Sequence, residues 1–190
     1  MVLLGFVYGS TDMHGGNGMT KLSLYLVTLL LGSRFPGPAI PPVAPPIAIV
    51  APASVSADEQ KLLNLANAER RSRGLNELRG NRMLVEVARE HSREMSELDY
   101  FDHVSPNPEF RTPKVRYLKA LGRTPSWAII SENIFYASIT SPELGHKCLM
   151  NSEPHRENIL NERFEEIGVG VYEAPDGKFW VTQVFLTQTG

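Results

Sequence analysis

The chain has 190 residues, of which 42% are hydrophobic and 21% are charged, and its formal net charge at pH 7 is −2. These values are typical of one soluble globular domain preceded by a shorter segment. The sequence has no long run of Lys or Arg, so it lacks the basic patch that binds nucleic acid or an anionic membrane surface. We therefore expect no nucleic-acid partner.

The N-terminal segment has the pattern of an export signal. Lys21 precedes an apolar run over residues 22–31, which is too short to span a bilayer comfortably. We therefore predict a leader and signal-like segment over residues 1–35, and a secreted or cell-envelope location. Two points stay open: whether Met1 or Met19 is the true start, and whether the signal is cleaved or retained as an anchor.

Residues 36–57 form a Pro- and Ala-rich stretch. Each proline fixes φ and removes a backbone donor, so the stretch favours extended polyproline II and acts as a semi-stiff spacer. We predict a linker here, followed by one folded domain over residues 58–190.

Two helices are predicted at the start of this domain. The first is capped by Ser56 or Asp58 and stops at Gly74. The second runs from Arg82 to Leu98, because residues at helical spacing form one buried face. The members of that face are Leu84, Val87, Ala88, His91, Met95 and Leu98.

Two more helices follow. The third spans Pro113–Leu121 and stops at Gly122. The fourth starts with Ser141 as its N-cap and Pro142 at the first helical position, and it continues to about Asn151.

Strands are predicted late in the chain. Residues 127–136 form a largely apolar run that predicts a buried strand. Apolar residues alternate over 167–171 and 179–186, and Pro175-Asp176-Gly177 between them favours a turn, so these segments predict an antiparallel hairpin. Helices first and a hairpin last, without βαβ alternation, predict an α+β fold.

A carboxylate within the predicted buried strand marks a candidate site. Glu132 is costly to bury unless it is paired. His103, after the second helix, and His155, in a short helical turn capped by Ser152, are the imidazoles available to pair with it. A structural hydrogen-bond cluster and a functional site both remain open.

Four ordered segments resemble the CAP (SCP-like) superfamily, in particular its bacterial secreted branch. They are residues 100–103 (YFDH), 131–134 (SENI), 151–160 (NSEPHRENIL) and 167–171 (IGVGV). The resemblance runs from about Leu62 to Phe185. It implies a three-layer α-β-α sandwich, which agrees with the α+β class.

In the family resembled, two His and two Glu line a central cavity, and the His pair can hold a divalent metal. By this resemblance His103 and Glu132 match the first His and the first Glu. The second Glu falls near Ser152 and Glu153, and the second His falls at Trp180, so the tetrad of the eukaryotic members is incomplete.

The bacterial segment places His155 near the cavity instead. His103 and His155 are then the candidate metal ligands, and zinc is the candidate cofactor, with Glu132 as a third ligand and an open position for water. No local H-E-x-x-H spacing supports such a centre. The residues expected to support the cavity are Asn133, Arg156 and Gln183.

Two functions from different classes follow. The first is a secreted, non-catalytic domain that binds a lipid, a glycan or a cell-wall component in the His/Glu-lined cavity. The alternative is a metal-dependent hydrolase acting on envelope peptide or peptidoglycan, with Glu132 as the general base. The missing histidine at Trp180 favours binding, so we name no catalytic residue. Cys148, the only cysteine, is interpreted as a small buried apolar residue and not as a nucleophile.

Overall fold

The computed structural model describes residues 2–4 and 54–189. The predicted leader, apart from residues 2–4, and nearly all of the predicted linker lie outside this range, so the proposed boundaries at residues 35 and 57 stay predictions. None of the described helices is both long enough and apolar enough to cross a membrane.

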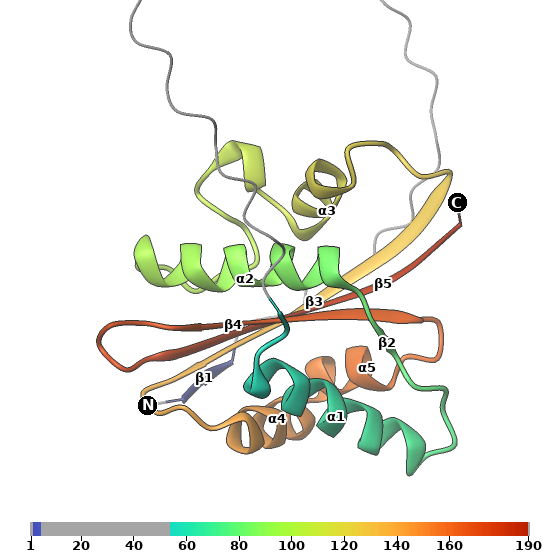
Figure 1. Ribbon diagram of the computed structural model, residues 1–190, viewed down its shortest axis with the longest axis horizontal. Coiled ribbons are helices and arrows are strands. Elements are labelled where there is room, and N and C mark those ends of the chain that lie inside the picture. The colour runs from blue at the N-terminus through green and yellow to red at the C-terminus, as the bar shows by residue number, and fades with distance from the viewer. Residues whose placement is uncertain (1, 5–53, 190) are drawn as a thin grey trace, which may run out of the picture. The chain divides into compact units, whose positions relative to one another are not determined.

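The described part contains five α-helices, one short 3-10 helix and five strands (Figure 1). The helices are α1 (Ala57–Arg71), α2 (Arg82–Glu97), η1 (Pro108–Phe110), α3 (Pro113–Leu121), α4 (Pro142–Asn151) and α5 (Glu153–Leu160). The strands are β1 (Val2–Leu4), β2 (Arg79–Gly80), β3 (Trp127–Ala137), β4 (Glu166–Glu173) and β5 (Phe179–Thr189).

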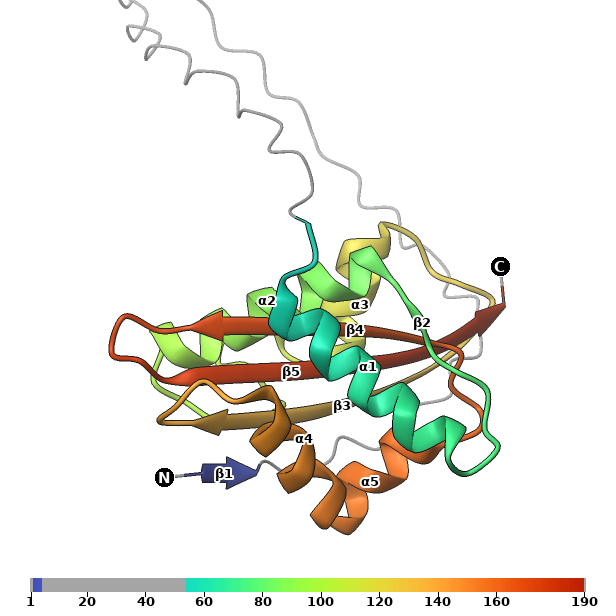
Figure 2. The same ribbon diagram turned by 60° about the horizontal axis from the view of Figure 1, so that its bottom comes forward.

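The strands form one sheet in the order β1-β3-β5-β4-β2. β3 and β4 both pair antiparallel with β5, β1 pairs antiparallel with β3, and the short β2 runs parallel to β4. Helices α2 and α3 cover one face of the sheet, and α1, α4 and α5 cover the other (Figure 1). Figure 2 brings this second face forward. The predicted three-layer α-β-α sandwich with a C-terminal antiparallel hairpin is therefore confirmed.

Local sequence signals explain where the helices begin and end. Ser56 caps α1 and forms a reciprocal capping box with Glu59. Asn81 caps α2 through its side chain. Gly122 ends α3 in the left-handed region, with φ of 68°, which glycine adopts without steric cost.

Each face of the sheet buries its own apolar core. The core under α2 and α3 contains Leu84, Val87, Ala88, Tyr117, Ala128, Ile130, Val184 and Leu186. The core under α1, α4 and α5 includes Leu62, Ala66, Phe135, Leu149, Ile159, Val181 and Phe185. Because side chains alternate along a strand, neighbouring residues of β3 and β5 contribute to opposite cores.

Two glycines allow α2 to lie unusually close to the sheet. A Cβ atom on Gly168 would lie 2.1 Å from the carbonyl carbon of Leu84, and one on Gly170 would lie 2.1 Å from the backbone nitrogen of Arg89. Both separations are impossible for real atoms, so the contact between β4 and α2 depends on the absence of side chains here.

Candidate functional site

Glu132 lies at the centre of a buried ionic cluster under α2. Its side chain shares the α2 face of the sheet with Ile130 and Ile134, and it is completely buried. Arg116 of α3 donates from Nη2 to both carboxylate oxygens, at 2.8 and 3.0 Å. The Nδ1 atom of His103 lies 2.7 Å from Oε1. The predicted pairing of Glu132 with an imidazole is therefore present.

A second imidazole approaches the same carboxylate from α2. The Nε2 atom of His91 lies 3.6 Å from Oε1 of Glu132, and both side chains are fully buried. The other ring nitrogen of His91, Nδ1, lies 3.7 Å from Oε2 of Glu94, one helical turn further along α2. His91 thus lies between two carboxylates.

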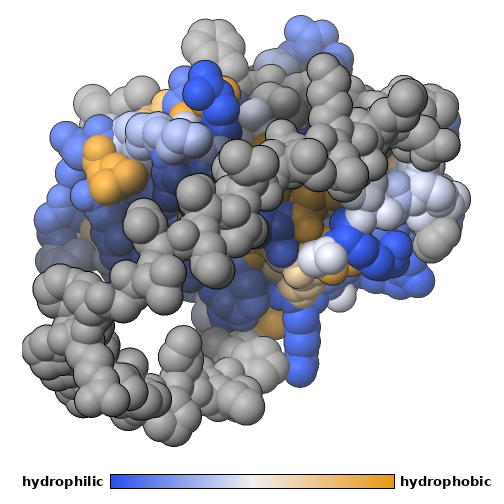
Figure 3. All heavy atoms as spheres, turned by 90° about the horizontal axis from the view of Figure 1, so that it is seen from above, coloured by the Kyte–Doolittle hydropathy of each residue, from blue (hydrophilic) through white to orange (hydrophobic). Residues whose placement is uncertain are grey.

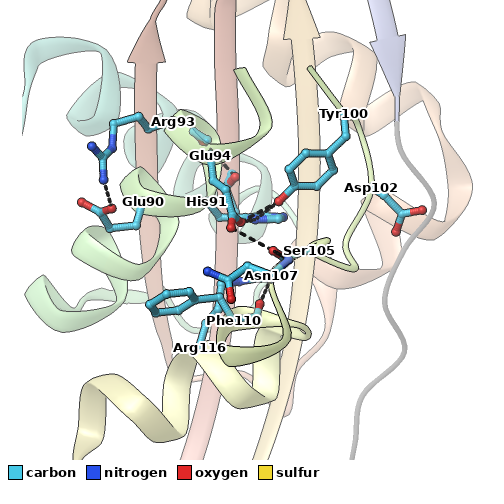
Figure 4. Close-up of polar contacts among 12 residues, drawn as sticks. Glu90, His91, Arg93, Glu94, Tyr100, Asp102, Ser105, Asn107, Phe110 and Arg116 are labelled. Atoms are coloured by element: carbon cyan, nitrogen blue, oxygen red, sulfur yellow. Dashed lines mark hydrogen bonds and ion pairs between the residues drawn. The ribbon is translucent and has the colours of Figure 1, made fainter. Parts of the chain in front are cut away.

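Glu94 anchors the segment that follows α2. The hydroxyl of Tyr100 donates to Oε2 of Glu94 at 2.6 Å, and Oγ of Ser105 donates to Oε1 at 2.8 Å (Figure 4). Arg116 of α3 holds the same segment through its backbone, since it donates to the carbonyl oxygens of His103, at 3.2 Å, and Phe110, at 2.8 Å. Together these bonds hold residues 99–112 against α2 and α3.

Both carboxylates are held in the charged form. Burial alone raises the pKa of Glu132, but the charge of Arg116 and the nearby His91 and His103 outweigh this and lower the pKa to about 2. Burial likewise raises the pKa of Glu94, but the nearby His91 and hydrogen bonds from Tyr100 and Ser105 lower it to about 2. Burial and the bond to Glu94 raise the pKa of the Tyr100 hydroxyl well above its usual range.

A groove opens from this cluster to the surface between α2 and residues 99–112. Its volume is about 400 Å³, and it is lined by Glu90, His91, Arg93, Glu94, Glu97, Leu98, Asn107, Phe110 and Arg116. A second hollow of about 200 Å³ shares Glu90, Phe110 and Arg116 with the groove. On the face seen from above, most of the visible described surface is hydrophilic and carries separate hydrophobic patches (Figure 3).

The structure does not bring His155 to His103 and Glu132, which corrects the expectation that the three converge. Asn133 follows Glu132 in β3 and therefore points to the opposite face of the sheet. There its Nδ2 atom donates to the carbonyl oxygen of His155 in α5, at 3.1 Å. The sheet thus separates the His155 ring from the Glu132 carboxylate, and His103 and His155 are not placed to share a metal ion.

The other predicted cavity residues lie with His155, on the α5 side. The prediction that Ser152 caps α5 is wrong: its side chain forms no cap hydrogen bond, and its Oγ atom lies 2.7 Å from Nδ1 of His155 instead. Glu153 is exposed. The predicted supporting residues form hydrogen bonds here: Asn133 donates to Oε1 of Gln183 at 3.1 Å, and Arg156 donates to the carbonyl oxygen of Met150 at 2.8 Å.

Comparison with known proteins identifies the family of the domain. The model of the cysteine-rich secretory protein (CAP) family matches residues 63–185, which is most of the described range. The chain belongs to the CAP family. The match includes His91, His103, Arg116 and Glu132, so the whole buried ionic cluster lies inside the CAP domain.

Bacterial CAP proteins are among the similar chains. The uncharacterized protein YkwD of Bacillus subtilis is 43% identical over 136 residues, which are 72% of this chain and 49% of that protein. The uncharacterized membrane protein YlbC of the same organism is 35% identical over 128 residues, 67% of this chain and 34% of that protein. This chain therefore spans half or less of the length of these curated relatives.

Solved structures agree with the fold. An extracellular protein with an SCP domain from Bacillus anthracis superposes with a TM-score of 0.57 at 32% identity, covering 69% of this chain and 40% of that one. An outer surface protein of Borrelia burgdorferi superposes with a TM-score of 0.62 at 19% identity, covering 72% of this chain and 97% of that one. The second likeness concerns the fold alone.

The described side chains of this CAP domain do not fit a divalent-metal centre. No group of three or more His, Cys, Asp or Glu among the described residues is placed to hold a metal ion. Trp180, where the family resemblance expects the second His, stacks on Tyr136 with ring centroids 4.5 Å apart. The guanidinium of Arg116 lies directly beside Glu132, where a bound cation would need the same carboxylate oxygens.

Sequence reasoning misses several residues of the groove. It places His91 only on the buried face of its helix, and it does not single out Arg116, Glu94, Tyr100 or Ser105. A usable signal is present on α2: His91 and Glu94 lie three residues apart, the spacing at which helical side chains meet.

The stability of the CAP domain is expected to fall in acid. The unfolded state binds protons near the ordinary glutamate pKa of 4.5, whereas Glu132 and Glu94 stay ionised down to about pH 2. Their stabilisation is therefore fully present above pH 4.5 and is lost as the pH falls from 4.5 towards 2. Urea unfolding of the wild type and Glu94→Gln should show a stability difference that shrinks over this interval. A difference independent of pH would contradict the assignment.

Proposed function

We propose that this CAP domain acts outside the cytoplasm, secreted or attached to the cell envelope, and binds a cell-wall component in the groove between α2 and residues 99–112. It catalyses no reaction on this ligand. The observation that carries the proposal is the state of Glu132, whose two carboxylate oxygens accept hydrogen bonds within the protein and whose pKa is about 2.

This state argues against the hydrolase alternative. A general base works best when its pKa lies near the operating pH and when it reaches the reacting water. Glu132 is too weakly basic for this role, it is fully buried, and Arg116 and His103 occupy its oxygens. The described donors offer no metal centre that could replace it.

The walls of the groove favour a polar ligand over a lipid. The groove wall is mostly carbon, but five of its nine lining residues carry a charged side chain, and a buried acyl chain would remove these groups from water. Glu90 pairs with Arg93, and Glu94 accepts from Tyr100 and Ser105. Leu98 and Phe110 supply the exposed apolar surface on which a sugar ring or a peptide side chain can pack. The extracellular SCP-domain relative from Bacillus anthracis supports a location outside the cytoplasm.

Binding to purified cell-wall sacculi tests this function. Leu98→Glu places a charge on the groove wall and is expected to weaken binding about tenfold, a loss of about 1.4 kcal/mol. The matched control is Ile139→Glu, because Ile139 is exposed to the same extent, 58% against 55%, and does not line the groove. Co-sedimentation with the sacculi gives the affinities of both variants.

Three outcomes would reject the proposal. Equal binding by both variants would place the binding surface elsewhere. Loss of wild-type binding in the presence of a chelator would favour a metal-dependent role. Release of soluble fragments from the sacculi by the wild type, absent with Glu132→Gln, would favour the hydrolase alternative.

A further inference from the structure

The Nε–H group of Arg116 is a hydrogen-bond donor left for a ligand. Its Nη2 group donates to Glu132 and to the carbonyl oxygen of His103, and its Nη1 group donates to the carbonyl oxygen of Phe110. The Nε–H group has no partner among the described residues, although the residue is only 4% exposed. A buried donor without an acceptor costs about 1 to 3 kcal/mol. Arg116 lines both the groove and the smaller hollow, so a molecule bound there lies next to its guanidinium side chain.

The charges around this donor favour a neutral acceptor over an anion. The carboxylate of Glu132 already compensates the charge of Arg116. The remaining cations at the groove and the hollow are also paired, Arg93 with Glu90 and Glu97, and Lys119 with Glu109. Glu94, with its pKa of about 2, adds a further negative charge. A carboxylate or phosphate ligand would be repelled, whereas the oxygen of a neutral amide would not.

A small apolar hollow also borders Arg116. Its wall is almost entirely carbon, contributed by Val87, Ala120, the Phe110 ring and the aliphatic parts of Glu86, Glu90 and Lys119. The Lys119 ammonium lies 4.0 Å from the centre of the Phe110 ring and helps to hold that ring in place. The volume of about 200 Å³ is more than enough to admit a methyl group and the atoms next to it.

A hydrogen-bond donor beside an apolar hollow suits a carbonyl oxygen that has a methyl group next to it. We propose that the site recognises the acetamido group of an N-acetylated amino sugar: the Nε–H group of Arg116 donates to the acetamido carbonyl oxygen, and the acetamido methyl enters the hollow beside Phe110. This inference rests on the proposed function and names the part of the cell-wall ligand that the groove selects. Figure 4 shows Arg116 and Phe110 next to each other at the base of the groove.

A pair of sugar trimers tests this selection. The trimer of N-acetylglucosamine carries the acetamido groups, and the trimer of glucosamine has the same length but carries ammonium groups in their place. Calorimetry with the wild type is expected to show at least about tenfold tighter binding of the acetylated trimer. Equal affinities would overturn the inference. Tighter binding of the glucosamine trimer would overturn it as well, because the acidic wall would then be selecting a cation.

Variants separate the two halves of the site. Arg116→Lys keeps a positive charge next to Glu132 but removes the Nε–H donor, so it is expected to abolish the preference for the acetylated trimer. Because this variant alters a buried pair, Ala120→Leu provides a second test on the exposed side of α3, where it narrows the hollow and leaves Arg116 in place. Ala68→Leu, at an exposed position of α1, is the matched control.

The results distinguish this inference from the proposed function. A preference that survives Ala120→Leu would overturn the acetamido site. If the sacculi bind in the groove, as judged by Leu98→Glu, but the acetylated trimer does not compete with them, the proposed function stands and the acetamido selection fails. If the sacculi do not bind but the acetylated trimer does, the acetamido site stands without the cell wall as its target.

Discussion

Replacing Glu132 with alanine is expected to lower the free energy of unfolding by about 3 to 5 kcal/mol, because a buried charge would lose its counter-ion. Arg116 is only 4% exposed and donates to both oxygens of this carboxylate, so the variant leaves a guanidinium in an apolar interior. Urea denaturation at pH 7 measures the loss. The double variant Glu132→Ala with Arg116→Met should recover part of it, since neither charge remains.

An exposed pair gives the control for this prediction. Lys119 and Glu109 form a comparable contact on the surface, where solvent screens the interaction. Glu109→Ala is therefore expected to unfold at the same urea concentration as the wild type. If Glu132→Ala also left the free energy of unfolding unchanged, Arg116 would have to find another partner or reach water. The buried ionic cluster would then not be a rigid part of the groove.

Adding a single methyl group at Gly168 is expected to destabilise the domain by about 3 kcal/mol or more, since overpacking of a tight contact forces the backbone to move. The new Cβ atom would lie 2.1 Å from the backbone of Leu84, and α2 would have to separate from β4. Thermal unfolding of Gly168→Ala measures the effect. Gly80→Ala in β2 is the matched control, because the nearest atom there is Cδ2 of Leu63 at 3.4 Å. Similar melting temperatures for both variants would show that α2 adjusts freely.

The predictable part of the fold is the part specified by local sequence. The helix at Pro113–Leu121 has its predicted bounds, and the helix predicted over Arg82–Leu98 ends one residue earlier. The hairpin turns where Pro175-Asp176-Gly177 predicts it, with Gly177 at φ of 82°. The two-residue strand β2 could not be predicted, because it depends on the pairing of Arg79 with Glu166 of β4, 87 residues away in sequence.

The pairing of Glu132 with His103 could be predicted from the sequence, but the position of His155 could not, and strand geometry explains the difference. The cost of burying Glu132 requires a partner, and His103 is one. Sequence reasoning assigns Asn133 to the same cavity because it is adjacent in sequence, but adjacent strand residues point in opposite directions. His155 consequently belongs to a separate network under the sheet. Arg116 lies 16 residues from Glu132, and only the tertiary packing of α3 brings the two together.

The glycine contact between β4 and α2 also determines how a ligand can enter and leave. One wall of the groove is α2, which lies against backbone atoms of the sheet and has no room to shift. The other wall, residues 99–112, is held by hydrogen bonds that it donates to Glu94 and accepts from Arg116, and these bonds break and reform individually. The groove can therefore widen only if residues 99–112 move. The residence time of a bound molecule is then governed by how often those few bonds open, and hardly at all by motion of the sheet or of α2.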